Sequence, residues 1–180
     1  MRVHLIRHFS PEVAAGVCYG SADLTVSDQV HEQMLPAAQA ALPPAVPVYS
    51  SPLKRCLRLA RALSPDPRID PRLAELNFGT WELRPWSGIA RAEVDAWAAD
   101  VAHYRPGGAD SVAAMALRVH GFYHDLMQAP HPECVVVCHA GTIRLFAARQ
   151  LGLTAAGMAR HAATHAHAIA YGGVLSLDCV

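Results

Sequence analysis

The sequence carries no excess of charge of either sign. Its 180 residues include 15 basic and 15 acidic side chains. A neutral chain gives no reason to expect nucleic acid or an anionic membrane as a partner. Lysine is almost missing, since Lys54 is the only one. Arginine therefore supplies nearly all of the fixed positive charge, in a form that suits bidentate contacts with anions.

Long apolar runs and cysteine motifs are also missing. No apolar stretch approaches the roughly 20 residues that cross a bilayer, and the N-terminus lacks the apolar core of a signal peptide. The five cysteines are odd in number and contain no CxxC spacing, which argues against a disulfide framework and a thiolate zinc site. We therefore expect a soluble, cytoplasmic protein with one domain over residues 1–180, long enough to bury a core.

Two short apolar runs each lead into a histidine. Val3–Ile6 is followed by Arg7 and His8, and Cys134–Cys138 is followed by His139. Runs of this length and composition are typical of buried parallel strands. Ligands of open α/β sheets bind at the carboxyl ends of the strands. The two histidines are therefore predicted to meet at one edge of a sheet and to form a reaction centre.

Periodicity and turn residues divide the rest of the chain. Helices are predicted over Thr25–Leu42, from Pro52 to Leu63, over Gly88–Tyr104, over Ser111–Gln128 and over Thr142–Gly152. A further strand is predicted at Val46–Ser50, and a loop at Pro65–Pro71. Alternation on both sides of Gly172-Gly173 predicts a C-terminal hairpin of His167–Tyr171 with Val174–Leu177.

Capping residues mark where the first two helices should begin. Thr25, with Asp28 three residues later, resembles a capping box. Ser51 is the expected cap of the second helix, with Pro52 at its first position. Pro36 lies inside the first helical pattern and is expected to kink the helix or to end its first part.

Arg55 lies in the first turn of the helix after Ser51, away from its apolar stripe. This position is close to the carboxyl end of a strand and to a positive helix terminus, where an anion binds well. The alternative is a solvated helix face formed by Lys54, Arg55, Arg58 and Arg61, because charged side chains are usually exposed.

The segment Arg72–Glu82 mixes two carboxylates with bulky apolar residues and has no clean period. A carboxyl group among side chains such as Phe78 and Trp81 has its protonated form favoured by desolvation. A general acid needs that protonated form. Glu75 and Glu82 are both candidates on this reasoning.

Together these residues fit the transfer of a phosphoryl group. Arg7 and Arg55 supply guanidinium forks for a dianion. One histidine, neutral near pH 7, attacks phosphorus and forms a phosphohistidine, and the other stabilises charge on the equatorial oxygens. A glutamic acid then protonates the leaving oxygen. No part of this scheme requires a metal ion or an organic cofactor.

Four blocks of the chain, in order, resemble signatures of the histidine phosphatase superfamily. The first, Leu5-Ile6-Arg7-His8, carries its arginine-histidine pair, and the second, Ser50–Arg55, is similar to S-S-P-x-x-R. The third, Leu73–Glu82, is similar to L-x-E-x-x-F-G-x-W-E-G, and the fourth, Val137–Arg144, to V-x-H-G-G-x-I-R. The blocks span nearly the whole chain, and jointly they are specific.

The resemblance implies a phosphoglycerate-mutase-like fold, an α/β three-layer sandwich whose mostly parallel central sheet has helices on both faces. It implies that His8 is the phosphorylated nucleophile, that Arg7, Arg55 and His139 form the phosphate pocket, and that Glu75 is the proton donor. His139 is thus both catalytic and phosphate-binding. The implied partner is a small phosphomonoester. Gly16–Thr25 and the short chain most resemble the α-ribazole phosphatase branch of cobalamin synthesis.

Three departures from the family pattern bear on the substrate. Phe9 stands where the family commonly has glycine and is expected to narrow or reshape the mouth of the pocket. Leu83 replaces the last glycine of the third block, so that loop is expected to shift. The P-G-G-E-S block reads Pro106-Gly107-Gly108-Ala109-Asp110-Ser111, with an inserted alanine and an aspartate in place of glutamate.

Other functions remain open. A mutase, or a phosphatase of sugar or nucleotide phosphates, is the main alternative among enzymes, and a phosphate-binding member of the fold without turnover is the alternative outside them. A zinc site is a further alternative, because histidines recur at short spacings in two places. These are His120 with His124, and His161 with His165 and His167. We expect no metal, since no HExxH occurs and other ligands are scattered.

Overall fold

A five-stranded sheet forms the centre of the computed structural model, which describes residues 1–165 and 169–179. The strands are β1 (Arg2–Arg7), β2 (Val48–Ser50), β3 (Arg68–Ile69), β4 (Glu133–Cys138) and β5 (Val174–Asp178). Their order across the sheet is β3-β2-β4-β1-β5. All neighbours run parallel except β5, which pairs antiparallel with β1. The mostly parallel sheet that was predicted is confirmed.

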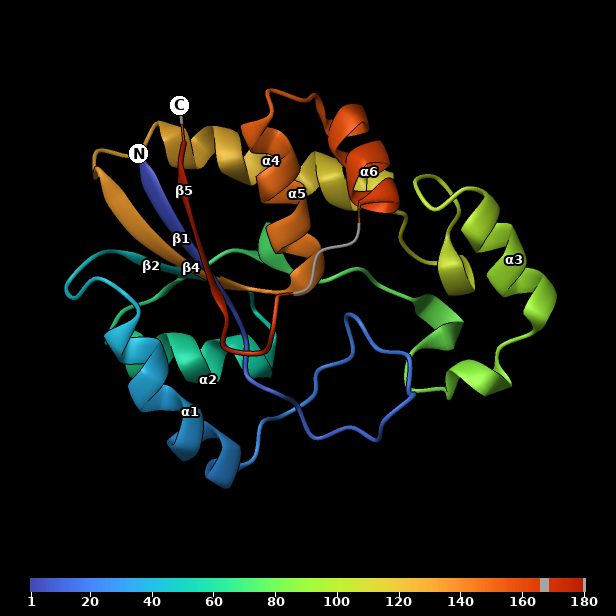
Figure 1. The fold of residues 1–180 in the computed structure, drawn as a ribbon, viewed down its shortest axis with the longest axis horizontal. Coiled ribbons are helices and arrows are strands. Elements are labelled where there is room, and N and C mark those ends of the chain that lie inside the picture. The colour runs from blue at the N-terminus through green and yellow to red at the C-terminus, as the bar shows by residue number, and fades with distance from the viewer. Residues whose placement is uncertain (166–168, 180) are drawn as a thin grey trace.

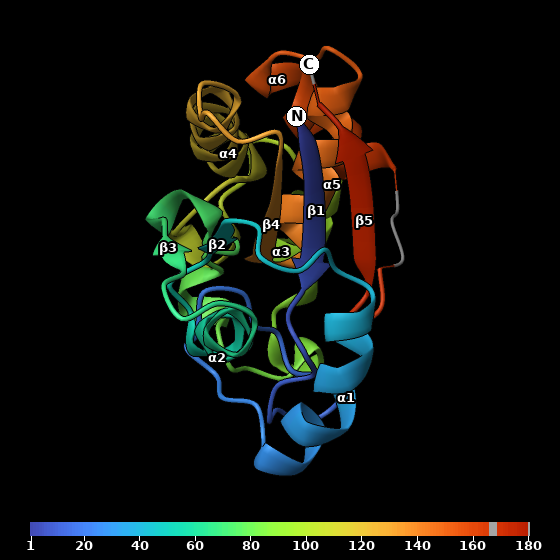
Figure 2. The same ribbon diagram turned by 90° about the vertical axis from the view of Figure 1, so that its left-hand side faces the viewer.

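Six α-helices accompany the sheet. They are α1 (Asp28–Ala40), α2 (Lys54–Leu63), α3 (Arg91–Ala99), α4 (Val112–Met127), α5 (Ala140–Gln150) and α6 (Ala155–Thr164). Figures 1 and 2 show α1 and α2 on one side of the sheet and α4, α5 and α6 on the other, with α3 beyond the end of the sheet. The predicted three-layer arrangement is confirmed.

Alternation along the buried strands builds the two interfaces between these layers. Val3 and Leu5 of β1 and Val136 of β4 belong to the core formed with α4, α5 and α6. Ile6 of β1 and Val135 of β4 belong to the core formed with α1 and α2. Because successive side chains of a strand point to opposite faces, an unbroken apolar run is required to fill both cores.

Register brings the ends of three strands together. Arg7 at the end of β1 is opposite Cys138 of β4, and Ser50 at the end of β2 is opposite Val137 of β4. The residues that follow these strands are His8, Ser51 and His139. The prediction that the two histidines meet at one edge of the sheet is therefore confirmed.

The predicted helix starts need correction. Ser27, not Thr25, caps α1, since its side chain accepts a hydrogen bond from the Val30 N–H, while the Thr25 hydroxyl donates to Glu12. The second helix begins at Lys54 rather than Pro52, and its cap residue Leu53 makes no side-chain cap bond. The Ser51 hydroxyl lies against His139 and accepts the Leu53 N–H before the helix begins. Pro36 lies within α1 and does not end it.

Several elements differ from those predicted. The helix predicted over Gly88–Tyr104 is confined to Arg91–Ala99, and the short strand β3 and the helix α6 were not predicted. The C-terminal hairpin is wrong where it is described, because Ile169–Tyr171 forms no strand and β5 pairs with β1. The remainder of its first arm, His167 and Ala168, lies outside the described residues. Within the described part of the chain, no helix is long and apolar enough to cross a membrane.

Candidate active site

His8 follows β1 and is 2% exposed. Its Nδ1 lies 2.7 Å from the carbonyl oxygen of Phe9. A carbonyl only accepts, so Nδ1 carries the proton and the lone pair is on Nε2. Burial, together with the nearby Arg55 and Arg7 guanidinium groups, lowers the pKa of His8 from 6.5 to about 3. The imidazole is therefore neutral at physiological pH, with an unprotonated Nε2.

His139 immediately precedes α5 and is fully buried beside His8. The centroids of the two rings are 5.1 Å apart, in an edge-to-face arrangement. Nε2 of His139 lies 2.7 Å from the Ser51 hydroxyl oxygen. Burial holds the pKa of His139 well below 6.5, and the neighbouring His8 and Arg55 side chains lower this pKa further.

Arg55 belongs to the first turn of α2 and is 1% exposed. Its Nε donates to Nε2 of His8 across 3.3 Å, and its terminal nitrogens donate to the carbonyl oxygens of Ala22 and Gly20. The alternative of a solvated helix face is therefore wrong for Arg55. It holds for Lys54 and Arg61, which are both exposed.

Glu82 explains how the loop at Gly20–Ala22 stays in place to receive Arg55. The Glu82 carboxylate accepts backbone hydrogen bonds from Gly20, Ser21, Ala22 and Phe78, at 2.9–3.1 Å, and one from the Ser21 hydroxyl. A carboxylate accepts several such bonds from adjacent N–H groups because it carries about four acceptor positions. Glu82 therefore anchors a loop and does not face the cavity described below.

Arg7 is held from two sides. One terminal nitrogen donates to the Ile169 carbonyl oxygen at 2.7 Å, and the guanidinium lies 3.9 Å from the centre of the Tyr171 ring. Its buried Nε has no hydrogen-bond partner among the described residues. The Tyr171 hydroxyl lies 2.5 Å from that of Tyr19, so the two loops flanking the site are joined. Arg7 thus retains a donor for an anion.

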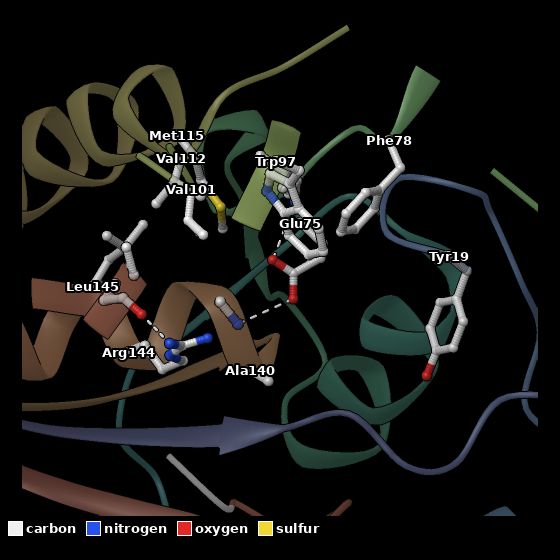
Figure 3. Close-up of a pocket in the computed structure, with 14 residues that line it drawn as sticks. Tyr19, Glu75, Phe78, Trp97, Val101, Val112, Met115, Ala140, Arg144 and Leu145 are labelled. Atoms are coloured by element: carbon white, nitrogen blue, oxygen red, sulfur yellow. Dashed lines mark hydrogen bonds between the residues drawn. The ribbon is translucent and has the colours of Figure 1, made fainter. Parts of the chain in front are cut away.

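Glu75 lies beside the first residues of α5, on the wall of a cavity. Its Oε2 accepts the Gly141 N–H and its Oε1 accepts the Leu76 N–H, each at 3.1 Å. The cavity has a volume of about 250 Å³. Figure 3 shows the Glu75 carboxylate between Phe78 on one side and Met115 on the other. The side chains that line the cavity are mostly apolar or aromatic; they also include Tyr19, Leu76, Trp97, Val101, Val112, Ala140, Arg144, Leu145, Ala162 and Ala163.

Three contributors to the site were missed from the sequence. Tyr171 stacks on Arg7, Arg144 lines the cavity, and Arg118 of α4 donates to the backbone next to Glu75. Arg144 lies within the fourth family block and was open to inspection there. Arg118 gave no signal, because an arginine on a helix is usually surface charge.

Two of the departures from the family pattern have a structural outcome. Phe9 is 1% exposed, packs in the core formed with α1 and α2, and does not line the cavity. The expectation that Phe9 narrows or reshapes the mouth of the phosphate pocket stays a prediction. Leu83 has a positive φ of 63° and donates its N–H to Cys18. Its backbone therefore keeps the left-handed conformation that glycine adopts most readily.

The histidines at short spacings do not gather into a metal site in the part of the chain that the structure describes. His161 and His165 stack with ring centroids 4.0 Å apart. Among residues 1–165 and 169–179, no three His, Cys, Asp or Glu side chains are grouped so as to hold a metal ion. His167 lies outside these ranges.

Comparison with known proteins gives consistent matches. The family model of the histidine phosphatase superfamily (branch 1) matches residues 3–172. Among curated proteins, the adenosylcobalamin/alpha-ribazole phosphatase of Escherichia coli (strain K12) is 30% identical over 119 residues. That alignment covers 62% of this chain and 59% of the relative, so the chain spans less than two thirds of that relative's length.

Solved structures extend the similarity to nearly the whole chain. The alpha-ribazole phosphatase from Shigella flexneri superposes with a TM-score of 0.83 at 26% identity, over 99% of this chain and 90% of that one. The mycobacterial glucosyl-3-phosphoglycerate phosphatase in complex with VO3 has a TM-score of 0.79 at 23% identity, over 97% and 91%. The second likeness is one of fold alone.

Proposed function

Because the chain belongs to the histidine phosphatase superfamily, we propose that it hydrolyses phosphomonoesters through a phosphohistidine formed on His8. The superfamily predicted from the four blocks is confirmed, and the relatives are named phosphatases, in agreement with the predicted phosphoric monoester hydrolase. The observation that carries the proposal is the unprotonated Nε2 of a buried, neutral His8, which accepts a hydrogen bond from the Arg55 Nε–H.

The first step makes a phosphorus–nitrogen bond and breaks a phosphorus–oxygen bond. Nε2 of His8 attacks phosphorus, and the alcohol oxygen leaves on the opposite side. Arg7 and Arg55 balance the charge of the phosphoryl oxygens, and His139 completes the phosphate pocket. Arg55 keeps its contacts with the Gly20–Ala22 loop while its Nε turns from His8 to the phosphoryl group.

Glu75 moves the protons of both steps. As an acid it protonates the departing alkoxide, so that a neutral alcohol leaves. Its carboxylate then takes a proton from a water molecule, which attacks the phosphohistidine. The phosphorus–nitrogen bond breaks, and inorganic phosphate leaves with His8 restored. The position of Glu75 supports this role. It lies on the wall of a cavity that also reaches the N-terminus of α5.

The lining of the cavity favours an apolar leaving group. Glu75 and Arg144 are its charged lining residues, and aromatic and aliphatic side chains make up most of the remainder. A site of this kind holds a leaving alcohol that carries a flat aromatic base better than one that is only a sugar or a hydroxy acid, whose hydroxyls would lack partners. We therefore assign the substrate to the α-ribazole 5′-phosphate type, within cobalamin synthesis. The five free cysteines agree with a cytoplasmic enzyme.

The main alternative, a mutase or a phosphatase of sugar phosphates, has less support. Such substrates carry several hydroxyl or anionic groups beyond the transferred phosphate. Among the lining residues that the structure describes, Arg144 is the one cation, and its terminal nitrogen already donates to the Ala162 and His165 carbonyl oxygens. A binding protein without turnover would not need Glu75 beside the leaving oxygen.

Release of inorganic phosphate from a panel of esters tests the function. We expect α-ribazole 5′-phosphate and aryl phosphates to be hydrolysed faster than glucose 6-phosphate and 3-phosphoglycerate. We expect full activity with EDTA and none in His8→Ala. Activity that EDTA abolishes and zinc restores would contradict the metal-independent scheme. Activity retained by His8→Ala would exclude His8 as the nucleophile.

A further inference from the structure

Arg118 of α4 reaches the backbone that carries Glu75. One terminal nitrogen donates to the carbonyl oxygens of Arg72, at 2.9 Å, and of Ala74. The other donates to the carbonyl oxygen of Glu75 itself at 3.1 Å. A single planar guanidinium therefore holds three carbonyl groups within four consecutive residues.

Asp110 closes this arrangement from the other side. Its Oδ2 lies 3.3 Å from Arg118, and both side chains are 23% exposed. Its backbone N–H donates to the carbonyl oxygen of Asn77 at 3.1 Å. Asp110 thus neutralises Arg118 and also holds the chain two residues beyond Glu75. It is the residue at which the P-G-G-E-S block departs from its usual glutamate.

The segment needs such support because it has little structure of its own. Residues 74–78 lie between two single-turn 3₁₀ helices, Pro71–Leu73 and Gly79–Trp81, and belong to no helix or strand. Proton transfer requires the acid and the leaving oxygen within hydrogen-bond reach, about 2.6–3.2 Å. A shift of about 1 Å in a catalytic group can slow a reaction about 100-fold. The position of Glu75 must therefore come from tertiary contacts.

We infer that Arg118, together with Asp110, is a positioning residue that sets the distance between the Glu75 carboxyl group and the leaving oxygen. The inference rests on the proposed role of Glu75. Among the described residues, the carboxylate itself receives hydrogen bonds from the N–H groups of Gly141 and Leu76. Displacing the Glu75 carbonyl group moves one end of the residue while those contacts hold the other, so the carboxyl group tilts away from the leaving oxygen.

Arg118→Lys tests the inference, because lysine keeps the charge but replaces a planar fork with a point donor. We expect kcat for an alkyl phosphate to fall about tenfold or more. The burst of phosphohistidine formed from an aryl phosphate should change less than about threefold, because a phenolate leaves without an acid. Arg91→Lys is the matched control, since Arg91 also pairs with an aspartate but on an exposed helix, and it should change neither.

Rapid-quench measurement of both esters, in single and double variants, separates the outcomes. If Arg118 acts through Glu75, then Arg118→Lys in the Glu75→Gln background should slow the alkyl ester no further. Equal slowing of both esters by Arg118→Lys, with Glu75→Gln selective for the alkyl ester, would overturn this inference alone. Equal slowing by Glu75→Gln would overturn the acid assignment and the inference with it.

Asp110→Asn provides a second variant that keeps an acceptor for Arg118 and alters the site less. We expect a smaller loss with the same selectivity for the alkyl ester. If Arg118→Lys fails to fold, this variant decides the question on its own. A uniform loss on both esters in Asp110→Asn would then contradict the positioning role.

Discussion

Gly141 has no side chain, and this leaves room for the Glu75 carboxylate. Its N–H donates to Oε2 of Glu75 at 3.1 Å, and a Cβ atom on Gly141 would lie only 2.3 Å from Oε1. The Glu75 side chain can therefore lie directly against the backbone at the start of α5. Any larger residue at this position must push the carboxylate away.

We expect Gly141→Ala to lower activity without unfolding the protein. The atom that must move is the end of a flexible side chain, and alanine favours a helix over glycine, so the free energy of unfolding should change by less than about 1 kcal/mol. Hydrolysis of an alkyl phosphate should slow about 10- to 100-fold. Kinetics with thermal unfolding would measure both.

Gly121→Ala is the control, because the added Cβ there would lie 3.8 Å from Arg72 Nη1, an ordinary van der Waals contact. Unchanged kinetics in Gly141→Ala would show that Glu75 need not occupy this position.

Part of the candidate site could be predicted residue by residue. Arg7, His8 and His139 follow directly from strands whose buried runs are visible in the sequence, and register then unites them. The sequence allows Arg55 either an anion-binding position or a solvated helix face, and only its burial in the structure decides between them. Arg118 and Tyr171 could not be inferred, because their roles depend on tertiary contacts with Glu75 and Arg7 that no local pattern encodes.

At the scale of elements, the Gly20–Ala22 loop joins two parts of the site. Its N–H groups face Glu82 and its carbonyl groups face Arg55. The Glu82 carboxylate therefore fixes the loop, and the loop in turn fixes the Arg55 guanidinium on its other side. In the proposed mechanism Arg55 faces the phosphoryl group and not the leaving alcohol, so a disturbance of this loop is expected to affect every substrate alike.

We expect Glu82→Gln to lower activity by the same factor with alkyl and aryl phosphates. The amide replaces one acceptor oxygen with a donor that opposes the loop N–H groups, which should cost about 1–3 kcal/mol of unfolding free energy. Parallel kinetics on both esters and denaturant unfolding would test this. A selective loss on the alkyl ester would identify Glu82 as a participant in proton transfer and weaken the assignment of Glu75.

The elements that could be predicted are those with strong local patterns. β1, β4 and α4 have continuous apolar runs or a clear helical stripe. β3 has only two residues, both exposed, and it pairs because β2 lies beside it. The predicted hairpin is wrong for a similar reason, because β5 pairs with β1 and not with the segment just before it. Local alternation cannot reveal a partner that is far away in the sequence.

At the scale of the whole molecule, the two buried histidines link stability to pH. Burial lowers the pKa of His8 to about 3 and that of His139 well below 6.5. Below pH 6.5 these two histidines bind protons in the unfolded chain but stay neutral in the folded protein. The stabilisation is therefore complete above the unfolded pKa and is lost as pH falls toward the folded value.

We expect the free energy of unfolding to fall with pH between about pH 6 and pH 4, and His8→Asn to reduce the slope by about 1.4 kcal/mol per pH unit. Asparagine retains a donor for the Phe9 carbonyl group without a titrating ring. Urea unfolding at several pH values would measure the slopes, with His124→Asn on the exposed side of α4 as the control. Equal slopes in wild type and His8→Asn would contradict the burial of a neutral His8.

The place of β1 between β4 and β5 also sets an order of events during synthesis. β1 is translated first, but its two neighbours begin only at Glu133 and Val174. At roughly 5–20 residues per second, β1 waits about ten seconds for its first partner. Protection of β1 from protease should therefore appear only in stalled nascent chains that have released β4. His8 is made early, and the strand end that brings His139 beside it arrives only with β4.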